Sequence, residues 1–190
     1  MVQSVVIRPL LLFPAILWKN LSLLWKIRGK DVCILEILNY NEAMFIACEM
    51  ERGAIRHYGR AMQLLKTLGR ESEPLYQQLR AMHAEEQSHL EQFSGCTCLE
   101  ELPLERQTLL TAMMNGWLFE GGLMGAARSG MMDDIPSMLK YAKESEALSA
   151  KKYREFAKLT ADEKSKAALL SIAAEEDRHL LELKAQEDAL

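Results

Sequence analysis

The heptapeptide A-E-E-Q-S-H-L at residues 84–90 recurs ninety residues later as A-E-E-D-R-H-L at residues 174–180. A second pattern, E-x-E-x6-Y, begins at Glu49 and again at Glu144, so each copy of it precedes one copy of the heptapeptide. Chance seldom repeats two separate motifs in the same order. The sequence therefore predicts two halves that are built alike, each from a pair of helices.

The residues shared by the two copies fall on one face of a helix. At about 100° per residue, Glu51 and Tyr58 lie within about 20° of each other, and Glu86 and His89 lie about 60° apart. Their counterparts in the second copy are Glu146, Tyr153, Glu176 and His179. Apolar residues accompany these groups at helical spacing, so we expect the polar groups to point into the interior.

Four carboxylates buried together require compensating positive charge, because an unpaired buried carboxylate is very costly. Two divalent cations would supply it. One Glu from each of two helices and a Glu-x-x-His from each of the other two is the ligand set of di-iron and di-manganese proteins, and imidazole and carboxylate both suit iron. The sequence therefore predicts two iron ions, with manganese as the alternative. The predicted ligands are Glu51, Glu86, His89, Glu146, Glu176 and His179.

The composition is that of a helical globular protein. The 190 residues are 49% hydrophobic and include only 10 Gly and 5 Pro, which excludes a disordered or fibrous chain. A net charge of -4 argues against nucleic acid as a partner. Four irregularly spaced cysteines do not form a disulfide framework, so we expect a reducing, cytoplasmic compartment.

Helix start and stop signals divide the chain into segments. We expect a first helical hairpin over residues 31–95, a partly helical crossover over 96–132 and a second hairpin over 133–190. The first long helix is predicted from Asp31 to Leu68, with a kink near residues 39–41 and a stop at Gly69. The last helix is predicted to begin at a capping box of Thr160 and Glu163.

This layout predicts the fold. Two hairpins joined by a long crossover are typical of an all-α, ferritin-like four-helix bundle. Residues 1–30 add an apolar segment that contains five basic residues and no acidic one. Its uncharged run is too short to span a bilayer. We expect an amphipathic helix that lies on the membrane surface, or an arm that packs on this domain or on a second copy of it.

Over roughly residues 35–190 the motifs resemble the rubrerythrin-type domains of the ferritin-like superfamily. The resemblance implies that Glu51 and Glu146 are terminal ligands and that Glu86 and Glu176 bridge the metals. It also implies that His89 and His179 cap one metal each. Tyr58 and Tyr153 resemble tyrosines that take part in catalysis by donating hydrogen bonds to the ligand carboxylates.

The same resemblance implies a di-iron oxidoreductase that reacts Fe(II) with peroxide or dioxygen. Rubrerythrins proper also carry a rubredoxin domain with two C-x-x-C pairs, and this chain has none. The electrons would then come from a separate donor protein. We further expect a homodimer.

Three alternatives remain open on the sequence. The stretch from Glu51 to Tyr58, together with Glu85 to Leu90, also resembles the demethoxyubiquinone hydroxylases, which are membrane-peripheral enzymes that act on a quinone ring. A second alternative is a protein that oxidises and stores iron without an organic substrate. A third is a structural module that has lost its metal, against which the six intact candidate ligands argue.

Several polar neighbours of the motifs are not expected to be metal ligands. His57 points about 100° away from Tyr58, and His83 has Ala173 as its counterpart in the second copy. The acidic neighbours are expected to be solvated or to lie beside the ligands; they are Glu49, Glu85, Glu144 and Glu175. For Glu144, an additional metal ligand is the alternative.

Overall fold

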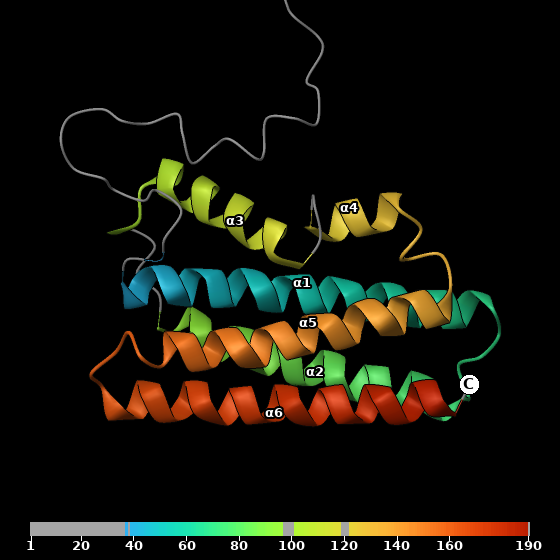
Figure 1. The fold of residues 1–190 in the computed structure, drawn as a ribbon. Helices are drawn as coiled ribbons and strands as arrows, with labels where there is room; N and C mark the ends of the chain where they lie inside the picture. Colours follow the sequence, from blue (N-terminus) through green and yellow to red (C-terminus); the bar gives the residue numbers. More distant parts are fainter. Residues whose placement is uncertain (1–36, 38, 97–100, 119–121, 190) are drawn as a thin grey trace, which may run out of the picture. The chain divides into compact units, whose positions relative to one another are not determined.

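The computed structural model describes residues 37, 39–96, 101–118 and 122–189. Within this part of the chain the structure is all-helical, with six helices and no strand (Figure 1). None of the described helices is both long and apolar enough to cross a bilayer. Residues 1–30 lie outside the described residues, and so does the helix predicted there.

The first helix, α1 (Tyr40–Thr67), begins and ends at residues that satisfy its backbone. Asn39 is extended, and its side chain accepts a hydrogen bond from the Glu42 amide at 3.0 Å. At the other end Gly69 has a φ of +71°, which glycine adopts without strain, and the chain turns there as predicted. The predicted kink near residues 39–41 is wrong, because Asn39 is the N-cap of the helix.

The other long helices are α2 (Pro74–Ser94), α5 (Ile135–Phe156) and α6 (Glu163–Asp188). Helix α5 is capped by Asp134, whose side chain accepts from the Ser137 amide at 2.7 Å. The capping box predicted for α6 is wrong. Asp162 accepts from the Ser165 amide at 2.8 Å, while the Thr160 hydroxyl accepts from the Asp162 amide at 3.1 Å.

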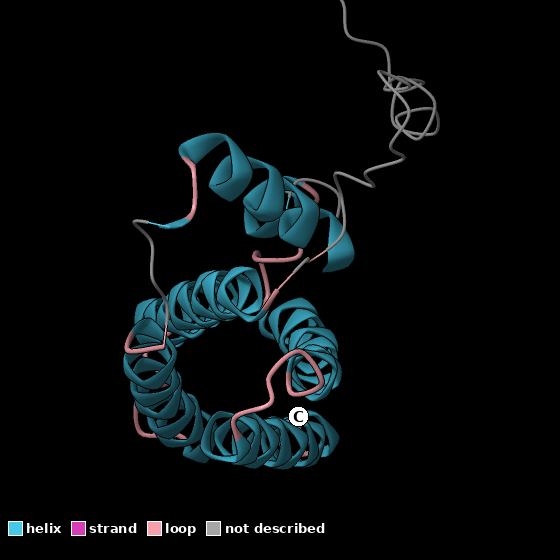
Figure 2. Cartoon of the chain, turned by 90° about the vertical axis from the view of Figure 1, so that its left-hand side faces the viewer, coloured by secondary structure: helices cyan, strands magenta, loops and turns pink. Residues whose placement is uncertain are grey.

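Seen end-on, the four long helices surround a common interior (Figure 2). Helix α1 packs extensively on α2, and α5 packs equally extensively on α6. These are the two hairpins expected from the repeat. The backbones of α1 and α5 pack closely between the two hairpins, whereas those of α2 and α6 lie farther apart and are joined by side-chain contacts.

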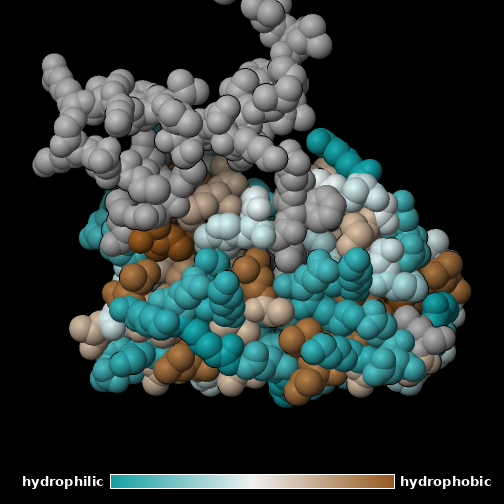
Figure 3. Space-filling model, viewed as in Figure 1, coloured by the Kyte–Doolittle hydropathy of each residue, from teal (hydrophilic) through white to brown (hydrophobic). Residues whose placement is uncertain are grey.

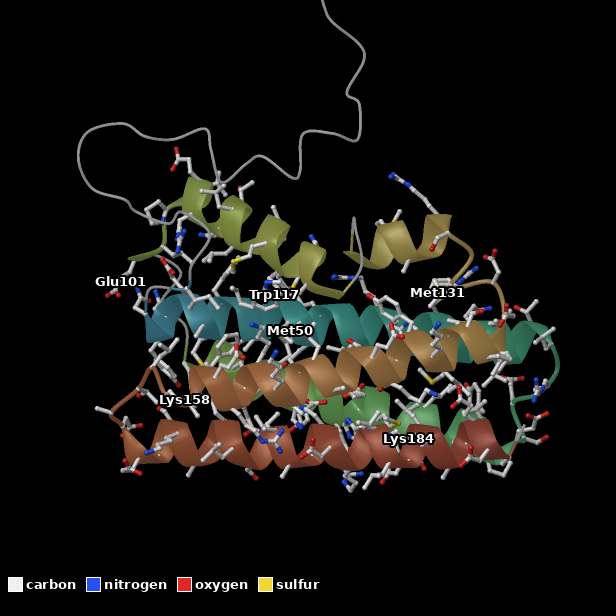
Figure 4. All side chains as sticks on the ribbon, viewed as in Figure 1. Met50, Glu101, Trp117, Met131, Lys158 and Lys184 are labelled. Atoms are coloured by element: carbon white, nitrogen blue, oxygen red, sulfur yellow. The ribbon has the colours of Figure 1, made fainter. Side chains whose placement is uncertain are left out.

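The crossover contains α3 (Leu104–Leu118) and α4 (Gly122–Arg128), both outside the ring of long helices (Figures 1 and 2). Helices α2 and α5 run in the same direction, so the crossover has to return along the length of the molecule (Figure 1). Trp117 lies on the side of α3 that faces α1 and α5 (Figure 4), and the Lys152 ammonium lies 4.2 Å from the centre of its ring.

The apolar core forms two separate clusters. One contains Met44 and Phe93 among its members, and the other contains Leu65 and Met82. On each long helix, the residues of the two clusters are separated by the acidic and histidine positions of the repeat. Outside, the visible face of α5 and α6 is mainly hydrophilic with scattered apolar side chains (Figure 3). The interior is therefore apolar at both ends and polar in the middle.

Candidate metal centre

The polar layer contains the six predicted ligands. Each is at most 2% exposed, although all six are titratable. Helices α1 and α5 contribute one Glu each, and α2 and α6 contribute a Glu and a His each, three residues apart. This spacing places both side chains on the inward face of the helix. The residues are Glu51, Glu86, His89, Glu146, Glu176 and His179.

These side chains form two overlapping groups. Within each group, the potential ligand atoms all lie within 4.8 Å of one another. The first group contains Glu51 and His89, the second contains Glu146 and His179, and both contain Glu86 and Glu176. The cluster therefore has a shared centre and two ends that repeat the same residue types.

Both imidazoles turn Nδ1 toward this centre. His89 Nδ1 lies 3.2 Å from a Glu86 oxygen and 3.4 Å from a Glu176 oxygen. His179 Nδ1 lies 3.2 Å and 3.5 Å from oxygens of the same two carboxylates. The terminal carboxylates are slightly farther, with Glu51 at 3.9 Å from His89 and Glu146 at 3.6 Å from His179. Six groups thus converge on one small volume.

The opposite ring nitrogen of each histidine contacts a carboxylate from the other half of the molecule. His89 Nε2 lies 3.2 Å from Glu175 of α6, and His179 Nε2 lies 2.5 Å from Glu85 of α2. Both carboxylates are partly exposed. A carboxylate on the outer nitrogen fixes the ring orientation and leaves Nδ1 as the atom directed at the centre.

The two tyrosines also cross between the halves. The Tyr58 hydroxyl of α1 donates to Glu146 of α5, and the Tyr153 hydroxyl of α5 donates to Glu51 of α1. Both tyrosines are at most 1% exposed. Each hydroxyl therefore occupies one oxygen of a terminal carboxylate and closes the cluster on the side of α1 and α5.

The pKa values show how the side chains share charge. Burial raises the pKa of Glu51 and Glu146 well above the usual range. Burial acts in the same direction on Glu86, but the two imidazoles beside it outweigh burial and lower the pKa. For His89, burial lowers the pKa, yet hydrogen bonds with Glu176 and Glu86 raise it to about 10.

The same balance holds at the other end of the cluster. The pKa of Glu176 is lowered despite burial, first by the neighbouring Glu146 carboxyl group and then by the two imidazoles. The pKa of His179 is raised despite burial, because carboxyl groups surround its ring. The side chains by themselves thus approach neutrality with two protonated acids, two carboxylates and two imidazolium rings. A cation that enters has to displace protons from these groups.

The hydrogen bonding of the cluster is incomplete in a way that suits metal ions. Among the described residues, five buried polar side-chain atoms make no hydrogen bond, and four of them belong to this cluster. They are Glu51 Oε2, Glu86 Oε1, Glu176 Oε1 and His179 Nδ1. Buried polar atoms without a partner are rare, and all four are potential metal ligands. The buried Glu and His groups could hold metal ions.

Four of the polar residues near the cluster do not belong to it. Glu144 is exposed, and the Glu49 carboxylate pairs with Arg52 on its own helix. His57 is buried, but its Nε2 lies 3.1 Å from the Met138 carbonyl oxygen, and burial lowers its pKa to about 4. Half-buried His83 belongs to neither ligand group.

From the sequence, Glu85 and Glu175 are expected either to be solvated or to lie beside the ligands. The structure places both against histidines of the opposite half. The repeat itself could have identified them, because the first Glu of A-E-E is present in both copies, as the second is. Their partners could not be read from spacing, since the contacts cross between two helices.

We compared the chain with protein-family models, with curated proteins and with solved structures, and found no match.

Proposed function

We propose that this chain is a ferritin-like four-helix bundle that binds two iron ions and acts as a rubrerythrin-like oxidoreductase. The observation that carries the proposal is the duplicated cluster of four Glu and two His, buried and incompletely hydrogen-bonded. Each group of the cluster offers three carboxylates and one imidazole, a donor set that suits iron and, less specifically, manganese.

The six ligands would hold the ions in two adjacent positions. Glu51 and His89 would serve one position, Glu146 and His179 the other, and Glu86 and Glu176 would serve both. When bound, the pair supplies two electrons together to peroxide or dioxygen. Reduction of hydrogen peroxide then yields two water molecules and takes up two protons.

The residues around the ligands hold them in place and limit solvent access. Tyr58 and Tyr153 each hold one oxygen of a terminal carboxylate, which would leave the other oxygen for an ion. Glu85 and Glu175 orient the two rings. The apolar clusters above and below the polar layer keep bulk water from the reaction.

The electrons for turnover would come from a separate donor protein. The working assembly would be a homodimer. Residues 1–30 would lie against a membrane surface. Quinone-ring hydroxylation and iron storage are the competing functions.

The test is to load the metal-free protein with Fe(II) and measure bound iron and peroxide consumption with an artificial reductant. We expect two iron ions per chain, a magnetically coupled pair in the oxidised protein, and catalytic peroxide removal that Glu86→Ala abolishes. Glu144→Gln is the matched control, because Glu144 is exposed and outside both ligand groups.

Other outcomes would favour the competing functions or contradict the proposal. Turnover of a demethoxyubiquinone analogue without peroxide removal would indicate the hydroxylase. Accumulation of many iron ions per chain would indicate storage. A protein that binds no iron would contradict the proposal altogether.

A further inference from the structure

The two ends of the cluster have the same ligand types but different surroundings. In the second half, the residue before the ligand histidine is Arg178, whose guanidinium donates to Glu85 at 2.7 Å. Arg178 also pairs with Glu182 one turn later on its own helix, at 2.9 Å. Glu85 is therefore held from two sides, by Arg178 and by the ring of His179.

The first half has a serine at the equivalent position. Ser88 is uncharged, and its hydroxyl accepts a hydrogen bond from Gln92 on the same helix at 3.4 Å. Glu175, the carboxylate that contacts His89, is about as exposed as Glu85 but has only the Ser171 hydroxyl, at 3.5 Å, as its other partner among the described residues. Among the described residues, no arginine pairs with Glu175 as Arg178 pairs with Glu85.

The distances between each outer carboxylate and its histidine also differ between the two ends. The contact from Glu85 to His179 Nε2 is 2.5 Å, whereas that from Glu175 to His89 Nε2 is 3.2 Å. A carboxylate that is fixed on both sides holds its histidine in one orientation. A carboxylate without that second partner, and with a longer contact to its histidine, exchanges the hydrogen bond with water more readily. Loss of such an outer partner weakens metal binding by about 10- to 100-fold in known sites.

We propose that Arg178 makes the two metal positions unequal, so that the position at Glu146 and His179 binds a divalent cation tightly while the position at Glu51 and His89 exchanges it readily. The inference rests on the proposed metal-binding function and deepens it. Arg178 is a positioning residue, because it acts on the cation through Glu85 and His179. In this protein the His89 end fills last and empties first.

The test is an equilibrium titration of the metal-free full-length chain with Co(II) alone, followed by competition with a chelator. We expect two Co(II) per chain with dissociation constants at least about tenfold apart. Glu51→Gln should remove the weaker position and leave the tighter one. Glu146→Gln should do the reverse, which assigns each constant to one end of the cluster.

Arg178→Ser should weaken the tighter position by about tenfold, and Ser88→Arg should narrow the gap between the two. A loss of affinity in Arg178→Ser is informative, because removal of a positive charge alone would strengthen cation binding. The matched control is Arg154→Ser. Arg154 also bridges α5 to α6, through Asp177, but it does not contact the cluster. Its removal should leave both constants within about twofold of wild type.

Each outcome decides the inference. Two positions of equal affinity, or an Arg178→Ser variant that binds as tightly as wild type, would overturn the inequality and leave the proposed function intact. An equal loss of affinity in Arg154→Ser would assign the effect to the general stability of α6 and overturn the role of Arg178. A chain that binds no Co(II) would overturn this inference together with the proposed metal site.

Discussion

The two hairpins of the molecule, α1–α2 and α5–α6, agree at the ligands and differ just outside them. Both present a Glu, a Tyr and a Glu-x-x-His to the same interior, and both send a tyrosine and an outer carboxylate across to the other hairpin. Some of the residues next to these groups are not repeated. Arg178 corresponds to Ser88, and His57 corresponds to Lys152.

The duplicated residues form the cluster itself, whereas the unduplicated residues lie outside it. The duplicated residues form a cluster that neither hairpin completes alone, because every terminal carboxylate is bonded by a tyrosine of the other hairpin. Of the unduplicated residues, Arg178 lies beside the His179 end of the cluster, whereas His57 contacts the Met138 carbonyl oxygen outside it. The largest effects should therefore come from shared groups, and smaller ones from groups that belong to one half.

Removal of a shared ligand should have the largest effect. Glu86 and Glu176 belong to both ligand groups, so Glu86→Ala or Glu176→Ala should lower the bound metal from two ions per chain to none at micromolar free metal. Elemental analysis of the purified variants measures this directly. Retention of one ion in either variant would show that the two positions do not share these carboxylates.

Metal binding should stabilise the fold by the next largest amount. At a free metal concentration of 100 times the weaker dissociation constant, the weaker position adds about 2.7 kcal/mol to the free energy of unfolding, and a tenfold tighter position adds about 4 kcal/mol. Urea denaturation with and without metal measures the gain. Glu51→Gln should keep the larger of the two contributions and Glu146→Gln the smaller. A full gain in either variant would contradict independent end positions.

His57 should make the first hairpin sensitive to acid. Burial lowers its pKa from 6.5 to about 4, so the unfolded chain binds the proton more readily between these values. Stability from the neutral ring is complete above pH 6.5 and is lost as the pH falls toward 4, by about 3 kcal/mol in total. The measurement is the free energy of unfolding of the metal-free protein between pH 7 and 4.

The comparison is with His57→Gln, which keeps a donor for the Met138 carbonyl and has no proton to gain. This variant should lose about 3 kcal/mol less than wild type over that range. Lys152→Gln, at the equivalent position of the second hairpin, should follow wild type, because this variant keeps His57. Identical curves for wild type and His57→Gln would show that the ring is not neutral in the folded protein.

The tyrosines should give the smallest and most symmetrical effects. Tyr58→Phe and Tyr153→Phe each remove one hydrogen bond to a buried carboxyl group, and each should lower the free energy of unfolding by about 1.5 kcal/mol. Thermal or urea denaturation of the two variants measures this. Values that differ by more than about 1 kcal/mol would show that the halves are not equivalent at this point.

Much of the fold follows from local signals in the sequence. The composition and the spacing of apolar residues predict an all-helical chain, and the described residues confirm it. The helix ends were harder to predict, because neighbouring polar residues compete for the same backbone groups. Asn39 caps α1 where a kink was expected, and Asp162 rather than Thr160 caps α6.

In the candidate site, too, the positions within one helix could be predicted from the sequence, whereas the contacts between helices could not. Helical periodicity places Glu86 and His89 on one face of α2, and the structure has both side chains buried there. Periodicity says nothing about distances between helices. The contacts from Glu85 to His179 and from Glu175 to His89 depend on how α2 and α6 lie side by side, so they required the structure.

The most direct test of the central claim is anomalous X-ray diffraction from crystals of the iron-loaded protein at the iron absorption edge. We predict two peaks per chain inside the ring of long helices, one between Glu51 and His89 and one between Glu146 and His179. Peaks on the protein surface, or none among these side chains at full iron loading, would contradict the claim.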